Sequence, residues 1–237
     1  MNKPNPRQVN VTLKLATSLD ARIATVIGAS QWITGSLARQ EVHRMRASYD
    51  CIITGIGTVL ADDPLLTARY GQDKVSQPLR ALLDTHARLP ATAKLVTSSD
   101  QGQVVWFTKE GGVIPAWASS LGIKHHNVPI AGSYSDASKH TGAVHLDLAA
   151  TLTILERSYG VRSLMIEAGP SLASSFLRAG LVNTIAWFRA PILLGGDGRS
   201  VFESLGVVEL AQAWRLHKID TQSFGPDLLE TYKIEKQ

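Results

Sequence analysis

The sequence predicts an α/β protein with one largely parallel sheet, because of the spacing of its apolar runs. Short runs rich in β-forming residues recur at 51–55, 79–84, 103–108 and 163–167. Helical patterns at 36–48 and 148–159 lie among them, and strands that alternate with helices are typical of parallel sheets. Two later β-like runs, 214–219 and 228–234, have no helical pattern between them. They predict an antiparallel finish to the sheet.

The first part of the chain is expected to contain a strand, a loop and a helix. Residues 9–16 alternate apolar and polar side chains, which predicts a strand, and 17–31 is expected to form a loop. Thr34 is a plausible N-cap for a helix at 36–48. That helix has an apolar face with Ala38, Val42, Met45 and Tyr49 and a cationic face with Arg39, His43 and Arg46.

Turn residues and apolar patterns predict the remaining elements. They are a loop or short helix at 58–69, a short strand within 119–126, an exposed loop at 129–142, a helix at 148–159 that ends at Gly160, a turn at 168–171, a helix at 172–179 that ends at Gly180, and a β-like run at 183–194. No internal repeat or clear boundary divides the sequence, so we expect residues 1–237 to form a single domain.

Composition excludes several classes of protein. Hydrophobic residues make up 44% and charged residues 19%, and no run reaches the roughly 20 apolar residues that span a bilayer. Residues 1–7 are polar with no apolar segment behind them, so we expect a cytoplasmic protein and no membrane partner. Cys51 is the one cysteine and is expected to be buried. The seven histidines form neither H-x-E nor H-E-x-x-H, so no metal is expected.

The charge balance favours an anionic ligand. The net charge is +4 and the isoelectric point is about 9.3, which fits either nucleic acid or a pocket for anionic small molecules. Lysines and arginines form no block, and aromatic residues make up only 6%, too few for a base-stacking platform. A small-molecule partner is therefore expected, and no nucleic acid.

The strongest local signal is I-E-A-G-P-S at 166–171, the pattern of a strand, a turn and the start of a helix. Pro170 suits the first helical position, and the next backbone N–H groups and the helix dipole make an anion site suited to the pyrophosphate of a dinucleotide. Glu167 lies at the carboxyl end of the strand, where it could bind a pyrimidine or donate a proton. An ordinary βα turn has the same pattern.

Further candidate residues lie elsewhere in the chain. Residues 55–59, G-I-G-T-V, follow a strand but lack the full G-x-G-x-x-G pattern of a dinucleotide loop. Arg46 and Arg69 could clamp a phosphate, although most arginines lie on solvated faces. Lys14 lies in a strand otherwise built for a core. It points either outward or into a pocket, where burial would have a desolvation cost.

Five stretches, in this order, resemble the reductase domain of the bifunctional riboflavin-biosynthesis deaminase/reductase, called RibD in bacteria. They are L-K-L-A-T-S-L-D at 13–20, S-Q-W-I-T at 30–34, G-T-V-L-A-D-D-P at 57–64, E-A-G-P-S-L at 167–172 and A-P-I-L-L-G at 190–195. The resemblance runs from about Val11 to Ile234. It implies a dihydrofolate-reductase-like fold, in which helices flank a mainly parallel sheet with an antiparallel C-terminal end. It also implies NADPH as cofactor and a homodimer.

The resemblance also implies roles for individual residues. By motif position, NADPH would contact Ala16, Trp32, Thr58, Asp62, Thr85 and the turn 169–175, which includes Gly169, Pro170, Ser171, Leu172 and Ala173. The substrate would contact Lys14, Ser30, Arg46, Leu66, Arg69 and Glu167. We expect Lys14 and Glu167 to be the catalytic pair, which orients the opened sugar and supplies or relays a proton.

The sequence departs from the family pattern at two places. Ala21 stands where the family usually has glycine, and if that position needs a positive φ, alanine costs about 1 kcal/mol. Thr85 replaces a common serine and keeps the hydroxyl. The zinc-deaminase pattern, H-x-E with P-C-x-x-C, is missing from the sequence.

The resemblance implies NADPH-dependent reduction of 5-amino-6-(5-phosphoribosylamino)uracil to its ribitylamino product. One alternative is an undeaminated pyrimidine or another pterin- or pyrimidine-like substrate. A second alternative is a protein that binds NADPH without turnover.

Overall fold

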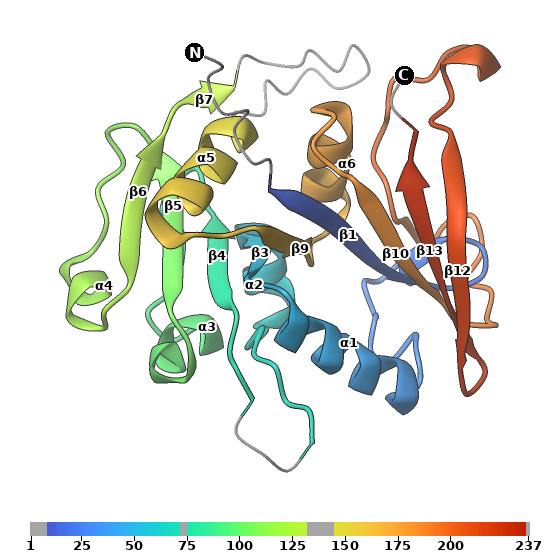
Figure 1. Ribbon diagram of the computed structural model, residues 1–237, viewed down its shortest axis with the longest axis horizontal. Coiled ribbons are helices and arrows are strands. Elements are labelled where there is room, and N and C mark those ends of the chain that lie inside the picture. Colours follow the sequence, from blue (N-terminus) through green and yellow to red (C-terminus); the bar gives the residue numbers. More distant parts are fainter. Residues whose placement is uncertain (1–8, 72–74, 132–144, 236–237) are drawn as a thin grey trace, which may run out of the picture.

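The computed structural model describes residues 9–71, 75–131 and 145–235. The strands of its main sheet are β1 (Asn10–Thr17), β3 (Cys51–Gly55), β4 (Leu79–Leu83), β5 (Val104–Lys109), β6 (Lys124–Val128), β9 (Ser163–Ile166), β10 (Thr184–Arg189), β12 (Leu216–Phe224) and β13 (Asp227–Ile234). Their spatial order is β12-β13-β10-β1-β9-β3-β4-β5-β6 (Figure 1). The seven strands from β10 to β6 are parallel, whereas β13 and β12 pair antiparallel. The predicted fold class and its antiparallel finish are confirmed.

Helices and two short ribbons complete the described part of the chain. The helices are α1 (Ser36–Ser48), α2 (Ile56–Asp62), α3 (Lys94–Thr97), α4 (Ala116–Ser120), α5 (Leu148–Tyr159) and α6 (Pro170–Arg178), with 3₁₀ turns η1 (Ser99–Gln101) and η2 (Leu210–Gln212). The ribbons pair β2 (Arg22–Ala24) with β11 (Arg199–Ser200) and β7 (Ile130–Ala131) with β8 (His145–Leu146), both antiparallel.

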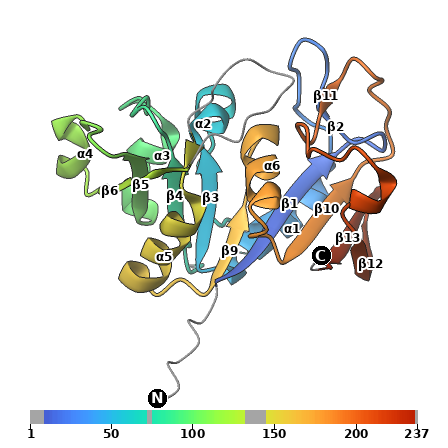
Figure 2. The ribbon, with the colours of Figure 1, turned by 90° about the horizontal axis from the view of Figure 1, so that it is seen from above.

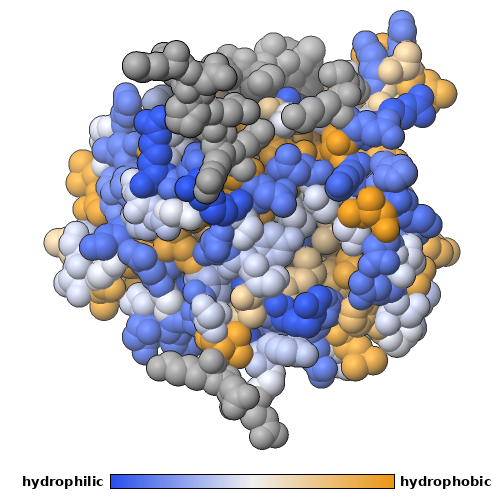
Figure 3. Space-filling model, viewed as in Figure 1, coloured by the Kyte–Doolittle hydropathy of each residue, from blue (hydrophilic) through white to orange (hydrophobic). Residues whose placement is uncertain are grey.

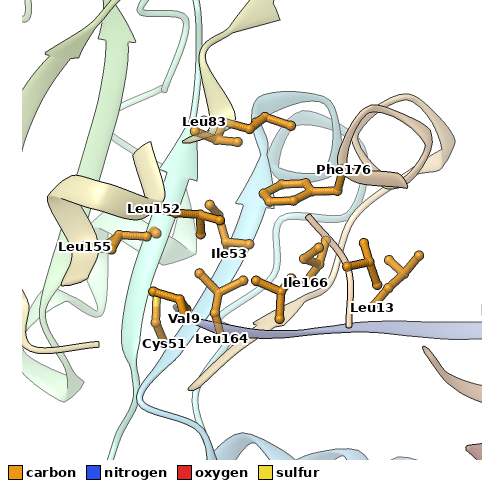
Figure 4. Close-up of a cluster of buried hydrophobic side chains, with 14 of the residues drawn as sticks. Val9, Leu13, Cys51, Ile53, Leu83, Leu152, Leu155, Leu164, Ile166 and Phe176 are labelled. Carbon is orange, nitrogen blue, oxygen red and sulfur yellow. The ribbon is translucent and has the colours of Figure 1, made fainter. Parts of the chain in front are cut away.

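The sheet carries a hydrophobic core on each face. On one face, α5 and α6 pack against the strands, and Figure 4 shows Leu152, Leu155 and Phe176 meeting strand residues there. Residues from α1, α2, α3 and α4 form the core of the other face with Trp106. Seen from above, the sheet lies between α6 and α1 (Figure 2). Strands covered on both faces are apolar throughout rather than alternating, which explains the continuous runs in the sequence.

Side-chain alternation along each strand divides these apolar runs between the two cores. In β3, Cys51 and Ile53 face α5 and α6, while Ile52 between them faces the α1 side. Burial raises the pKa of the Cys51 thiol, so it packs as a small apolar side chain. On β6, His125 approaches Thr108 and His126 approaches Tyr159. Adjacent residues on a strand point to opposite faces, as expected for this pair.

Two helix starts differ from the sequence prediction. The N-cap of α1 is Gly35, not Thr34, and it makes no side-chain capping bond; its N–H instead donates to Asp227 Oδ2 at 2.6 Å. Helix α6 starts at Pro170, so it takes up part of the predicted turn at 168–171. Helix α5 matches its predicted range and ends at Gly160, whose φ of 69° suits a residue without Cβ.

Other differences concern short elements. The predicted loop at 17–31 contains β2, which pairs with β11 far along the chain, so local sequence gives no sign of it. Helix α2 begins two residues before the expected range 58–69, and strand β6 ends two residues after the expected range 119–126, so each prediction overlaps the observed element without matching its bounds. Most of the loop expected at 129–142 lies outside the described residues.

The described surface is mixed in character. Hydrophilic and hydrophobic residues are interspersed over the face in Figure 3. Each helix in the described ranges falls short of the length and apolarity that a membrane span requires.

Replacing Ala21 by glycine should stabilise the protein. Ala21 has a φ of 59°, in the left-handed region where a Cβ is strained. We expect Ala21→Gly to raise the free energy of unfolding by on the order of 1 kcal/mol in urea titrations. Ala24→Gly is the matched control: Ala24 is buried in β2 outside that region, so its variant should be less stable. Loss of stability in Ala21→Gly would contradict the strain.

Candidate active site

A cavity of about 620 Å³ lies at the carboxyl ends of β1, β9, β3 and β4. Its lining includes Ala16, Gly55, Leu83 and Ala168, which end or follow those four strands. A hollow of about 770 Å³ lies at the opposite edge, where several strands begin. Ligands of open α/β sheets bind outside the carboxyl ends of the strands, and the first cavity also holds buried charges. We therefore take it as the candidate site.

Three charged side chains meet at the base of the cavity: Lys14, Arg46 and Glu167. Arg46 donates two hydrogen bonds to the Glu167 carboxylate, from Nε to Oε1 at 2.6 Å and from Nη2 to Oε2 at 3.0 Å. Lys14 Nζ lies 3.7 Å from Oε2. These side chains are only 10–15% exposed, with Glu167 the least exposed at 10%. We call them the charged triad.

The alternation of each strand explains how the triad assembles. In β1, Leu13 and Leu15 face the α5 and α6 core, so Lys14 between them faces the α1 side. Glu167 follows Ile166 of β9, another residue of that core, and therefore also faces α1. Arg46 reaches them from the last turn of α1. Of the two orientations that the sequence left open for Lys14, the structure shows the inward one, in which the side chain points into a pocket. Burial of the ammonium there has a desolvation cost.

Burial and mutual contact shift the pKa values of Glu167 and Lys14 within the triad. Burial alone would raise the pKa of Glu167, but Arg46 and Lys14 outweigh it and lower the pKa to about 2. Burial, with help from Arg46, lowers the pKa of Lys14 below 10.5 even though Glu167 acts in the opposite direction. Glu167 is therefore an anion near neutral pH, and Lys14 holds its proton less tightly than a lysine in water.

Two arginines donate hydrogen bonds to backbone carbonyl oxygens in the segment 64–69, part of which lines the cavity. The carbonyl oxygen of Thr67 accepts a bond from Arg46 Nη1 at 3.2 Å, and that of Leu65 accepts one from Arg80 Nη1 at 3.0 Å. Burial lowers the pKa of Arg80 to about 10. Leu66, between those carbonyls, is buried with a φ of 55°, an unfavourable conformation for leucine. These contacts hold the strained residue against the cavity.

Arg69, which contacts His43, extends the positive charge beyond the triad. Arg69 Nη2 lies 3.4 Å from His43 Nε2, and His43 Nδ1 lies 3.2 Å from the Thr67 carbonyl oxygen. Burial and neighbouring arginines lower the pKa of His43, so the imidazole is neutral near pH 7. Arg69 lies beside the cavity and is not among its lining residues.

The first turn of α6 lines the same cavity as the triad. Its N-cap Gly169 makes no side-chain capping bond, and the Gly169 N–H donates to Thr58 Oγ1 at 3.2 Å. A Cβ at Gly169 would meet only Thr58 Oγ1, at 4.0 Å, so the protein itself leaves room there. Uncapped N–H groups and the helix dipole suit the pyrophosphate of a nicotinamide dinucleotide, and the residues present fit that group.

The structure brings together most of the residues singled out from the sequence. Those that line the cavity are Lys14, Ala16, Ser30, Arg46, Thr58, Asp62, Leu66, Thr85, Glu167, Gly169, Pro170, Ser171 and Leu172. Three others do not line it. Trp32 is 68% exposed and stacks under the Arg39 guanidinium at 4.4 Å, and the side chain of Ala173 is buried in the core. The third is Arg69, on the rim.

Several cavity residues escaped the sequence analysis. The basic ones among them are His86, Arg88, His145 and Arg199. Each lies in a loop or short strand with no motif or periodicity to mark it, so only proximity in space reveals it. In the described ranges, histidine, cysteine, aspartate and glutamate side chains form no group of three that could hold a metal ion.

Acid should weaken the contribution of Glu167 to stability. Its pKa falls from 4.5 to about 2 on folding, so its stabilisation is full above about pH 5 and disappears as the pH falls towards 2. We expect Glu167→Gln to cost on the order of 3 kcal/mol at pH 7, because Arg46 and Lys14 lose their counter-charge. Urea titrations should show nearly the same gap in unfolding free energy between variant and wild type at pH 7 and pH 5, and a smaller gap at pH 4. A constant gap would contradict this linkage.

Comparison with known proteins places this geometry in a family. The model of the RibD C-terminal domain matches residues 9–229. The riboflavin biosynthesis protein RibD of Escherichia coli (strain K12) is 33% identical over 229 residues, which cover 92% of this chain and 58% of that protein. The chain thus spans a little over half the length of this relative.

Two further relatives match along nearly the whole chain. The 2,5-diamino-6-ribosylamino-4(3H)-pyrimidinone 5′-phosphate reductase of Methanothermobacter thermautotrophicus is 34% identical, over 95% of this chain and 98% of that protein. The structure of Acinetobacter baumannii RibD (form 1) superposes with a TM-score of 0.83 and 31% identity, over 98% of this chain and 59% of that one. The expected dihydrofolate-reductase-like fold is confirmed, and the chain belongs to the RibD C-terminal domain family.

Proposed function

We propose that this chain reduces 5-amino-6-(5-phosphoribosylamino)uracil to the ribitylamino product with NADPH, as a reductase of riboflavin biosynthesis. The charged triad carries the proposal, because it places a fixed carboxylate and a lysine of lowered pKa in a buried site whose lining also includes the first turn of α6. The family to which the chain belongs supports the reaction class.

The undeaminated pyrimidine is the second candidate substrate. The Methanothermobacter thermautotrophicus relative, whose name specifies 2,5-diamino-6-ribosylamino-4(3H)-pyrimidinone 5′-phosphate, matches this chain over 98% of its own length. The two substrates share the ribose phosphate and the reacting carbon, so the same triad serves either one. They differ at the pyrimidine ring, where an amino group replaces an oxygen.

The chemistry requires one proton at the substrate nitrogen. Opening of the ribose breaks the C1′–O4′ bond, moves a proton from the amine nitrogen to O4′ and leaves a C1′=N imine. A nicotinamide cofactor supplies the hydride that C1′ accepts. In our proposal Lys14 gives the nitrogen its proton, because burial makes the ammonium more acidic. Glu167 remains an anion and positions Lys14 and the substrate.

The remaining binding roles follow from the cavity wall. We assign the substrate to Ser30, Arg46, Leu66, Arg69 and Glu167. We assign NADPH to Ala16, Trp32, Thr58, Asp62, Thr85 and residues 169–175. Trp32 and Arg69 lie outside the cavity lining, so contact with them requires that the ligand extend past the rim. Ala173 is fully buried, and its N–H donates to the Gly169 carbonyl oxygen at 3.1 Å, so it supports the turn from within.

The proposal also covers the domain organisation, the oligomeric state and the location of the protein. We propose that residues 1–237 act as a single reductase domain, that the protein forms a homodimer, and that it works in the cytoplasm without a membrane or nucleic-acid partner. The positive cavity supports a phosphorylated small molecule as the ligand, since Lys14, Arg46, Arg88 and Arg199 outnumber the carboxylates of Asp62 and Glu167 in its lining.

Absorbance at 340 nm tests the reaction. With NADPH and each pyrimidine supplied separately, we expect oxidation with at least one, and the larger kcat/KM identifies the physiological substrate. Heat-inactivated protein is the control. Tight binding of NADPH without oxidation by either compound would instead identify a non-catalytic binding protein.

Variants of Lys14 test the proton donor. We expect Lys14→Arg to preserve the charge balance with Glu167 but to lower kcat about 10²- to 10⁴-fold, because a guanidinium does not release a proton near neutral pH. The KM for NADPH should change little. In the wild type, kcat should fall at alkaline pH with a midpoint below 10.5. A Lys14→Arg enzyme with full kcat would exclude proton donation by Lys14.

A further inference from the structure

Gln77 lies outside the candidate site, yet its side chain holds the backbone of the segment 64–69. It comes shortly before β4 and lines the hollow at the opposite edge of the sheet. The Ala68 N–H donates to Gln77 Oε1 at 2.9 Å, and Gln77 Nε2 donates to the Ala68 carbonyl oxygen at 2.8 Å. This two-way pairing resembles the exchange of bonds between neighbouring strands, and it fixes the orientation of the peptide groups on both sides of Ala68.

The segment 64–69 depends on such side-chain contacts for its shape. Its residues belong to neither a helix nor a strand, so no repeating backbone ladder holds them in place. Arg80 and Arg46 bind carbonyl oxygens in its first part. Gln77 then holds Ala68, which is only 3% exposed. Buried peptide groups need partners of this kind, because an unpaired one costs free energy.

Arg69 follows Ala68 directly, and its guanidinium is directed by weaker contacts. Nη1 lies 3.4 Å from Thr67 Oγ1, and Nη2 lies 3.4 Å from His43 Nε2. Interactions of this length are weak, and the Arg69 side chain is exposed. The backbone position set at Ala68 therefore decides where the guanidinium lies, and its planar donors suit a phosphate.

We propose that Gln77 is a positioning residue for the substrate: by pairing with Ala68, it directs Arg69 to the cavity rim. This inference rests on the proposed function, in which Leu66 and Arg69 bind the substrate. Gln77 is absent from the cavity lining, so it acts through the segment 64–69 rather than by contact with a ligand. The residues assigned to NADPH lie outside this segment, so the effect is confined to the substrate.

Kinetics of Gln77→Met test the inference, because methionine has nearly the length of glutamine but cannot reproduce the two-way pairing. We expect the KM for the pyrimidine substrate to rise about 10-fold, while kcat and the KM for NADPH change little. Gln77→Glu should be impaired as well, since it places an oxygen against the Ala68 carbonyl. Gln103→Met is the matched control: Gln103 is an exposed glutamine of the same hollow, and its variant should keep the wild-type KM.

A double-mutant cycle separates positioning from a general weakening of the fold. If Gln77 acts through Arg69, Gln77→Met should raise the KM for the pyrimidine no further in an Arg69→Gln background. Increases in KM that multiply in the double variant would overturn the inference. The same holds for a Gln77→Met enzyme with wild-type KM and a lower free energy of unfolding in urea, because Gln77 would then serve stability alone.

Binding without turnover separates this inference from the proposed function. By calorimetry, ribose 5-phosphate should bind the wild type about 10-fold more tightly than Gln77→Met, while the two proteins bind NADPH equally. Equal affinities for ribose 5-phosphate would contradict positioning through Arg69. A wild type that binds this sugar phosphate as expected but oxidises NADPH with neither pyrimidine would refute the proposed function alone.

Discussion

The buried contact between the Glu167 carboxylate and the Arg46 guanidinium is the interaction on which the cavity depends. Two short hydrogen bonds join these groups, and Lys14 completes the set at 3.7 Å. Charges taken out of water require such partners, because an unpaired one would cost several kcal/mol. The triad therefore constrains the strand ends of β1 and β9 and the last turn of α1 to fixed positions. Counted formally as two cations and one carboxylate, the triad has a charge of +1, which favours an anionic ligand.

The parallel sheet makes this arrangement possible. Residues that follow β1, β9, β3 and β4 all emerge at one edge, although they are far apart in the sequence. The apolar strands below are packed on both faces and provide a rigid base for the polar edge. Loops at this edge supply further residues of the cavity lining. Leu66 and Ala21 show that the fold tolerates positive φ angles in such loops.

Charge is distributed along the cavity in a way that matches its proposed ligands. The triad and the Arg69–His43 pair lie on the α1 side, and Arg88 lies beyond β4. The start of α6, with Gly169 beside Thr58, lies between them. A sugar phosphate and a dinucleotide phosphate can thus be held at separate places by separate cations. This separation orients two anionic ligands in one pocket without placing their phosphates together.

Local sequence determined the regular elements, because periodicity and end signals depend on neighbouring residues. The apolar run 51–55, the helix 148–159 with Gly160, and the strand-turn-helix at 166–171 were all predictable for this reason. Tertiary structure alone decided that Lys14 points inward, that β2 pairs with β11, that Arg88 joins the cavity, and that Trp32 and Arg69 lie outside its lining. These features arise from contacts between segments distant in sequence, whose positions depend on how the whole sheet is assembled and packed.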